Sequence, residues 1–143
     1  MTTLLDTSAC IYLLDGDHSD PRHSFMVDLL RRAHDDAERV VISPVTYAEL
    51  LVLPIRTQNI EAEARVTLFA TRAVEVLQIG AETAPLAASI RATTGLRMPD
   101  ALIVASAQQH DVNRIVGNDE VMEAAGLDHL RIQIGRASCR ERV

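Results

Sequence analysis

The sequence contains no lysine, no tryptophan and few other aromatic residues. All 14 basic residues are arginine, which excludes mechanisms built on a lysine, such as Walker-type phosphate loops and Schiff-base enzymes. Aromatic residues make up only 3% of the chain, too few for the base-stacking platform of an RRM or OB-fold. The two cysteines, Cys10 and Cys139, provide neither a disulfide framework nor zinc-ligand spacing.

Long hydrophobic runs and an excess of basic residues are also absent. The apolar runs are far shorter than the roughly 18 residues needed to cross a bilayer, so we expect no membrane association. The first six residues lack the basic region of a signal peptide, and we expect a cytoplasmic protein. The net charge of -6 does not indicate a basic nucleic-acid-binding surface, although metal ions can offset the charge at a site that acts on nucleic acid.

The remaining composition is that of one globular domain. The chain has 143 residues, of which 48% are hydrophobic, enough to bury a core but too few residues for a second domain of ordinary size. We expect the domain to span residues 1–133. Residues 134–143 resemble one frame of a translated sequencing adapter, and we expect them to be a non-native or disordered tail.

Short β-type runs alternate with helical runs along the chain. The expected strands are 3–6, 40–43, 74–79, 114–116 and 130–132. The expected helices are 9–14, 24–37, 44–55, 58–72, 82–94, 99–110 and 120–125. Such alternation predicts an α/β fold whose central, mainly parallel sheet of about four or five strands carries helices on both faces.

Three acidic residues fall near the ends of expected strands, where open parallel sheets bind their ligands. Asp6 ends the first strand, Glu49 lies early in the helix after the second, and Asp119 follows the fourth. Asp100 lies in the first turn of an apolar helix. Clustered carboxylates repel one another unless a cation offsets them, and hard oxygen ligands suit Mg²⁺ or Mn²⁺. These four acids predict a metal site that can activate water for phosphodiester hydrolysis.

Each of these acids also has a simpler interpretation. Asp6 would cap the helix that follows it. Asp100 would interact favourably with the dipole of its helix, and Asp119 is a residue type that is common in turns. Glu49 interrupts the apolar run 48–53, so we expect its helix to be largely buried and the acid to need a partner or a metal ion. Alternatively, Glu49 lies on a solvated stripe in line with Arg56.

Histidine does not offer a competing catalytic site. All of the histidines lie in polar turns or at helix ends, where we expect them to be solvated. They are His18, His23, His34, His110 and His129.

Four short motifs occur in one order along residues 3 to about 132. They are Leu4-Leu5-Asp6-Thr7-Ser8, Thr46-Tyr47-Ala48-Glu49-Leu50, Pro99-Asp100-Ala101-Leu102-Ile103-Val104-Ala105 and Val116-Gly117-Asn118-Asp119. In order and separation they resemble the motifs of PIN-domain ribonucleases, in particular the VapC-type toxins of type II toxin–antitoxin pairs. The first three are fairly specific as a set, and the fourth is weaker.

The resemblance implies a three-layer α/β/α sandwich that cleaves RNA endonucleolytically. It places Mg²⁺ or Mn²⁺ among Asp6, Glu49, Asp100 and Asp119. It also implies a homodimer and inhibition by a small VapB-like antitoxin that blocks the site.

Three further residues match family positions around the acids. Ser8 and Asn118 match positions that support the site by hydrogen bonding. Arg97 is a candidate contact to RNA phosphate, or else a solvated loop cation.

Two departures from the family pattern fall near the fourth motif. Gly117 stands where the family often has Thr or Ser, and Val121 stands where a further Asp is common. Both weaken the case for a second metal ion, and the sequence leaves open whether one or two ions bind.

Three other functions fit part of the pattern. A haloacid-dehalogenase-like phosphatase would use Asp6 as nucleophile, but it usually needs an acid where Ser8 stands and a basic residue that is often lysine. A metal-dependent adhesion module would need Ser in place of Cys10. A non-catalytic PIN-like domain that binds RNA also remains open.

Overall fold

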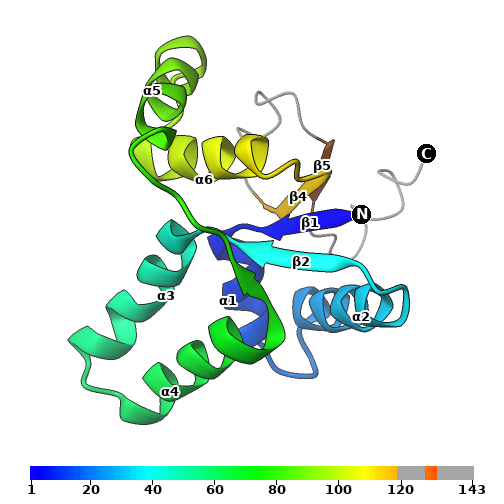
Figure 1. Ribbon diagram of the computed structural model, residues 1–143. Helices are drawn as coiled ribbons and strands as arrows, with labels where there is room; N and C mark the ends of the chain where they lie inside the picture. Colours follow the sequence, from blue (N-terminus) through cyan, green and yellow to red (C-terminus); the bar gives the residue numbers. More distant parts are fainter. Residues whose placement is uncertain (119–127, 132–143) are drawn as a thin grey trace.

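The computed structural model of the chain describes residues 1–118 and 128–131 (Figure 1). The order of elements is β1 (Thr2–Leu5), α1 (Thr7–Asp15), α2 (Pro21–Asp35), β2 (Arg39–Ile42), α3 (Pro44–Arg56), α4 (Ile60–Leu68), the π-helical turn η1 (Phe69–Ala73), β3 (Glu75–Val76), α5 (Thr83–Thr94), α6 (Met98–Gln109), β4 (Arg114–Gly117) and β5 (Asp128–Arg131). The predicted site residue Asp119, Val121, the expected helix 120–125 and the expected tail lie outside the described residues.

The strands form one parallel sheet in the described part of the chain. Its order is β3-β2-β1-β4-β5, and every neighbouring pair is parallel. Leu4 at the centre pairs with Val41 of β2 on one side and with Ile115 of β4 on the other. The chain therefore builds outward from β1 to β3, crosses back, and continues from β4 to β5, which confirms the predicted α/β class.

Helices cover both faces of the sheet, as the alternation of side chains along each strand requires. Leu4, Val41 and Ile115 belong to a core cluster with residues of α5 and α6. Their strand neighbours, such as Leu5, belong to a second cluster with residues of α1, α2, α3 and α4. Figure 1 shows the two helical layers on opposite sides of the sheet. The structure is the three-layer α/β/α sandwich that the resemblance implied.

Several element boundaries differ from the sequence prediction. Helix α2 begins at Pro21 rather than near residue 24, because Asp20 caps it by accepting a hydrogen bond from the backbone N–H of Arg22 (2.9 Å). The helix expected over 58–72 divides into α4 and η1, where the N–H of Val74 bonds to the carbonyl of Phe69 (3.3 Å). The strand expected over 74–79 is shortened to two residues.

Two helices occupy the positions that matter most for the site. Helix α1 starts directly after the central strand β1, so its first turn lies at the carboxyl edge of the sheet. Helix α6 is the central, mostly buried helix that its apolar sequence predicted. None of the described helices combines the length and apolar character that a membrane span requires.

Candidate functional site

The candidate site lies at the carboxyl edge of the sheet, where β1 and β4 are neighbours. The order of strand addition reverses there, because β2 and β3 extend to one side of β1 while β4 and β5 extend to the other. Open parallel sheets form a ligand crevice at such a switch point. Asp6 follows β1, and Asn118 follows β4. Helix α6 leads into the start of β4, so the first turn of α6 lies at the opposite, carboxyl edge of the sheet.

The Asp6 carboxylate is buried and forms the cap of α1. Its side chain is only 3% exposed. Oδ1 accepts hydrogen bonds from the backbone N–H of Ala9 (2.9 Å) and from the Ser8 hydroxyl (2.7 Å). The capping interpretation of Asp6 is therefore confirmed. It does not compete with a role in the site, because the carboxylate also lines the cavity described below.

Ser8 and Asn118 lie in one hydrogen-bonded chain with Asp6. The Ser8 hydroxyl donates to Asp6 and accepts from the backbone N–H of Asn118 (3.1 Å). The Asn118 side-chain amide in turn donates to the hydroxyl of Tyr12 (2.8 Å), and the Arg22 guanidinium lies 4.6 Å from the centre of the Tyr12 ring. Sequence analysis missed Tyr12, although it follows Ser8 by four residues and so shares its helix face.

Glu49 projects from α3, and the structure corrects the expectation for this helix. Helix α3 is not largely buried, and Leu53 is 60% exposed. The helix extends away from the sheet and packs mainly against α1 and α4 (Figure 1), so that a single stripe is covered. The buried residues of that stripe are Thr46, Leu50 and Pro54. Glu49 is itself exposed, and its Oε1 accepts a short hydrogen bond from the Thr7 hydroxyl (2.6 Å).

Asp100 lies in the first turn of α6, where its negative charge interacts favourably with the helix dipole. Its side chain is 15% exposed and forms an ion pair with Arg97, the residue before the helix, at 3.4 Å. The Arg97 side chain is 81% exposed. Such a pair contributes little to stability, because solvent screens it. Arg97 can therefore exchange this carboxylate for another anion.

A cavity of about 240 Å³ brings three of the four predicted acids together. The carboxylates come from the end of β1, from α3 and from the start of α6, so residues distant in sequence converge. The polar residues of its lining are Asp6, Thr7, Ser8, Glu49, Arg97 and Asp100. We call this space the acidic cavity.

The donor set of the acidic cavity suits a hard, hydrated cation. Carboxylate and hydroxyl oxygens are the ligands that Mg²⁺ and Mn²⁺ prefer. Among residues 1–118 and 128–131, no group of three or more His, Cys, Asp or Glu side chains is arranged to hold a metal ion. Mg²⁺ usually keeps several waters and binds through one or two carboxylates, a number that Asp6 and Asp100 of the cavity lining can supply.

Other reactive groups are occupied elsewhere. Nε2 of His110 contacts the carbonyl of Gln78 (2.7 Å), and Nδ1 of His23 contacts the carbonyl of Tyr12 (3.1 Å). Cys10 is a residue of α1 and is fully buried. Burial, and secondarily the nearby Asp6 carboxylate, raises the pKa of the Cys10 thiol far above its ordinary value, so this thiol is not a nucleophile.

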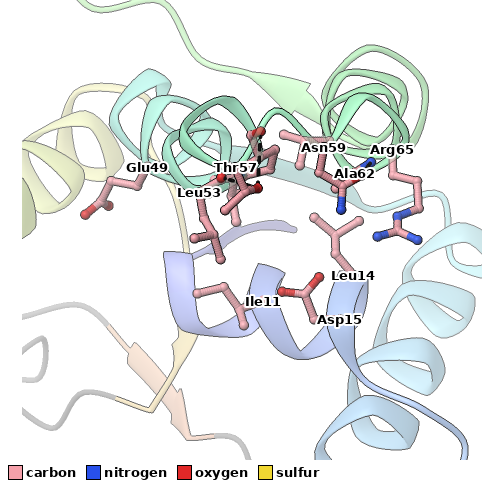
Figure 2. A pocket seen from close by; sticks show the side chains of 12 residues that line it. Ile11, Leu14, Asp15, Glu49, Leu53, Thr57, Asn59, Ala62 and Arg65 are labelled. Carbon is pink, nitrogen blue, oxygen red and sulfur yellow. Dashed lines mark hydrogen bonds between the residues drawn. The ribbon is translucent and has the colours of Figure 1, made fainter.

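A second, larger cavity adjoins the first between α1, α3 and α4. Its volume is about 370 Å³. Figure 2 shows Ile11 and Leu14 of α1 facing Leu53 of α3 and Ala62 of α4 across this space. Glu49 and Ile11 line both cavities. We call this second space the apolar groove; its charged lining residues, besides Glu49, are Asp15 and Arg65.

Solved structures of similar fold include proteins described as a toxin and as a toxin–antitoxin complex. VapBC2 from Rickettsia felis, bound to a promoter DNA fragment, has a TM-score of 0.77 at 16% identity and covers 93% of this chain and 100% of that chain. VapBC-1 from nontypeable Haemophilus influenzae has a TM-score of 0.69 at 22% identity, covering 92% and 98%. VapC20 from Mycobacterium tuberculosis, described as a Sarcin-Ricin loop cleaving toxin, has a TM-score of 0.67 at 20% identity, covering 87% and 95%.

The family assignment comes from the sequence match. No curated protein sequence matches this chain significantly. The family model described as "PIN domain" matches residues 3–127, which include all four predicted acids. The fold, the acidic cavity at the switch point and this match agree, and the chain belongs to the PIN domain family.

Proposed function

We propose that the protein is a metal-dependent endoribonuclease and the toxin of a toxin–antitoxin pair. The observation that carries this proposal is the acidic cavity, where carboxylates from three separate elements meet at the switch point of the sheet. Their shared location is difficult to explain by helix capping alone, because Glu49 caps no helix and lies in the second turn of α3. The solved toxins of the same fold support the same conclusion.

The residues that would hold Mg²⁺ or Mn²⁺ are Asp6, Glu49, Asp100 and Asp119. When bound, the ion supplies an activated water and stabilises the leaving oxygen of the phosphodiester. Ser8 and the N–H of Ala9 hold the Asp6 carboxylate in a fixed orientation.

Thr7 and Arg97 shape the cavity from its two sides. Thr7 holds the Glu49 carboxylate at the border of the cavity by its short hydrogen bond. Arg97 is exposed and weakly paired, so an RNA phosphate can compete with Asp100 for its guanidinium. Occupation of Arg97 by phosphate would then leave the Asp100 carboxylate to the cation.

A cleavage assay with matched Asp-to-Asn variants tests the proposal. The wild-type protein is incubated with a panel of structured RNAs, including a Sarcin-Ricin loop oligonucleotide and transfer RNA, in Mn²⁺ or in EDTA. We expect the wild type to cleave RNA in Mn²⁺ but not in EDTA. We expect Asp100→Asn in Mn²⁺ to cleave no more than the wild type does in EDTA. Asp28→Asn is the control, because Asp28 lies on α2 with its side chain 56% exposed. An uncut panel, together with cells that tolerate expression, would contradict the nuclease proposal.

The same preparation separates the alternative functions. Hydrolysis of a phosphate monoester without RNA cleavage would favour the haloacid-dehalogenase-like phosphatase. RNA binding that survives in Asp100→Asn, with no cleavage by either protein, would favour a non-catalytic RNA-binding domain. The acidic cavity favours the nuclease over both, since it offers several carboxylates rather than one nucleophile.

The apolar groove is the surface that we propose for the antitoxin. It is continuous with the acidic cavity through Ile11 and Glu49. A helix or extended segment of a VapB-like partner that fills the groove would therefore reach the edge of the active site. Solved relatives are complexes of toxin with antitoxin, which supports such a partner here.

Self-association and the extent of the catalytic unit complete the proposal. Ile60 and Leu68 of α4 are strongly exposed and do not line the apolar groove, so they provide apolar surface for a homodimer. Residues 1–133 carry the activity in this proposal, and a chain that ends at residue 133 cleaves at the wild-type rate. We place the protein in the cytoplasm, where its RNA substrate is.

A further inference from the structure

Gly117, the last residue of β4, lies against the Asp6 carboxylate. A Cβ atom built on the Gly117 backbone would overlap three side-chain atoms of Asp6, with Oδ2 the nearest, followed by Cγ and Oδ1. Gly95 is the glycine with positive φ in the described residues, so Gly117 is not required by its backbone conformation. Glycine is needed at this position because of what packs on it.

Asp6 cannot easily move away from an added Cβ. Asp6 as a whole is 3% exposed, and its Oδ1 accepts hydrogen bonds from Ser8 and Ala9 in the first turn of α1. Its backbone N–H bonds to the carbonyl of Val116 (3.0 Å), the residue immediately before Gly117. The side chain of Asp6 is therefore bound to α1 and its backbone to β4. A Cβ added at Gly117 would push these two elements apart.

The steric overlap at Gly117 would also affect the hydrogen bond of Asn118, the next residue. The N–H of Asn118 donates to Ser8, and Ser8 donates to Asp6. A carboxylate displaced from Gly117 would have to stretch or break this chain. A small displacement at residue 117 thus disturbs the cap of α1 and the acidic cavity together.

We propose that Gly117 is a positioning residue that provides the seat for the Asp6 carboxylate and thereby fixes it in the acidic cavity. In this chain the glycine does more than omit the hydroxyl of Thr or Ser, since either residue would carry the Cβ for which there is no room. The steric part of the proposal stands on the packing alone, and its consequence for a cation rests on the proposed function.

A double-mutant cycle tests the steric part without any metal ion. The melting temperatures of wild type, Gly117→Ala, Asp6→Ala and the double variant are compared in EDTA. Asp6→Ala deletes all three atoms that the new Cβ would meet, so we expect Gly117→Ala to lower the melting temperature of the wild type but not that of Asp6→Ala. Gly80→Ala is the matched control, because its Cβ would meet only the exposed side chain of Glu82 among its nearest atoms.

The steric part is decided by the change in melting temperature that Gly117→Ala causes in the wild type and in Asp6→Ala. An equal loss on adding Gly117→Ala to both backgrounds, or no loss in either, would overturn the proposal. If Gly117→Ala does not fold, a double variant that folds as well as Asp6→Ala supports it, and a double variant that also fails overturns it.

Mn²⁺ affinity, measured by titration calorimetry on folded protein, tests the consequence for the site. We expect Gly117→Ala to bind Mn²⁺ about ten- to a hundred-fold more weakly, as is usual when a residue that orients a ligand is changed, and Gly80→Ala to bind as wild type does. Cleavage by Gly117→Ala should recover in part at high Mn²⁺ concentration. Unchanged affinity in Gly117→Ala would overturn the positioning role. A wild type that binds no Mn²⁺ would instead count against the proposed function, while the cycle in EDTA still decides the packing.

Discussion

The acidic cavity and the apolar groove are neighbours with opposite chemistry. The acidic cavity is the smaller, at about 240 Å³, and apart from Glu49 its polar lining comes from the starts of α1 and α6. The apolar groove, at about 370 Å³, is lined mainly by aliphatic side chains of α1, α3 and α4, together with the polar residues Asp15, Glu49, Thr57, Asn59 and Arg65. Ile11 and Glu49 belong to both linings, so α1 and α3 contribute to each space.

Different parts of α1 line the acidic cavity and the apolar groove. Its first residues, Thr7 and Ser8, line the acidic cavity, and residues from later turns, Leu14 and Asp15, line the apolar groove. One helix therefore holds the proposed chemistry at its start and a docking surface further along. A partner in the groove could block the cavity by contact at Glu49, without any change of conformation in the toxin.

The largest expected effect separates the two roles of Asp6. Asp6→Asn keeps a good capping side chain but loses the charge, whereas Asp6→Ala loses both. We expect both variants to lose Mn²⁺ binding and cleavage. We expect Asp6→Ala alone to lose a further 1 kcal/mol or so of unfolding free energy, measured by urea denaturation. Cleavage by Asp6→Asn at the wild-type rate would show that the cap is the only role of this residue.

The next effect should be confined to the apolar groove. Leu53→Arg places a charge in the groove, and we expect it to weaken binding of an antitoxin encoded beside this chain by about 30-fold or more, which corresponds to about 2 kcal/mol. Ile55→Arg is the control, because Ile55 lies on the same helix, is 55% exposed and is outside the groove lining. Surface plasmon resonance measures the affinity, and equal weakening by both variants would contradict docking in the groove.

The sequence was sufficient for the layers of the fold and for three of the acids that line the acidic cavity, while the predicted Asp119 lies outside the described residues. Alternating β-type and helical runs predicted the parallel sheet, and the position of Asp6, Glu49 and Asp100 after or between strands predicted their approach. These features follow from local patterns and from a general rule of parallel sheets, which do not depend on the details of packing.

The exposure of α3 and the role of Gly117 required the structure. The apolar run 48–53 predicted a buried helix, but burial depends on which elements cover the helix, and α3 extends beyond the sheet. Gly117 could be compared with a family pattern, yet its contact with Asp6 joins two strands that are distant in sequence. Tyr12 was missed for the same reason, since its partners belong to α2 and to the residue after β4.

A smaller effect is expected from Tyr12→Phe, which tests the support of the acidic cavity from outside. The substitution removes the hydroxyl that accepts a hydrogen bond from Asn118 and keeps the ring beneath Arg22. We expect a loss of about 1 kcal/mol or less in unfolding free energy, together with a lower rate of cleavage at unchanged Mn²⁺ affinity. A variant that cleaves as fast as the wild type would show that Asn118 needs no support from Tyr12.

The smallest effect concerns pH and the cap of α2. Hydrogen bonds from the Arg22 side chain and backbone hold the pKa of the Asp20 carboxyl below its ordinary value of 3.8. The folded protein therefore favours the ionised form, so this contribution to stability is fully present above pH 3.8 and is lost as the pH falls through the lowered folded value. Asp20→Asn keeps a capping side chain without the charge. We expect wild type to melt slightly higher than Asp20→Asn at pH 6 and the two to converge toward pH 3, as measured by circular dichroism. A gap that does not close as the pH falls would show that ionisation of Asp20 makes no contribution to stability, because a contribution from the charge must disappear when the carboxylate is protonated.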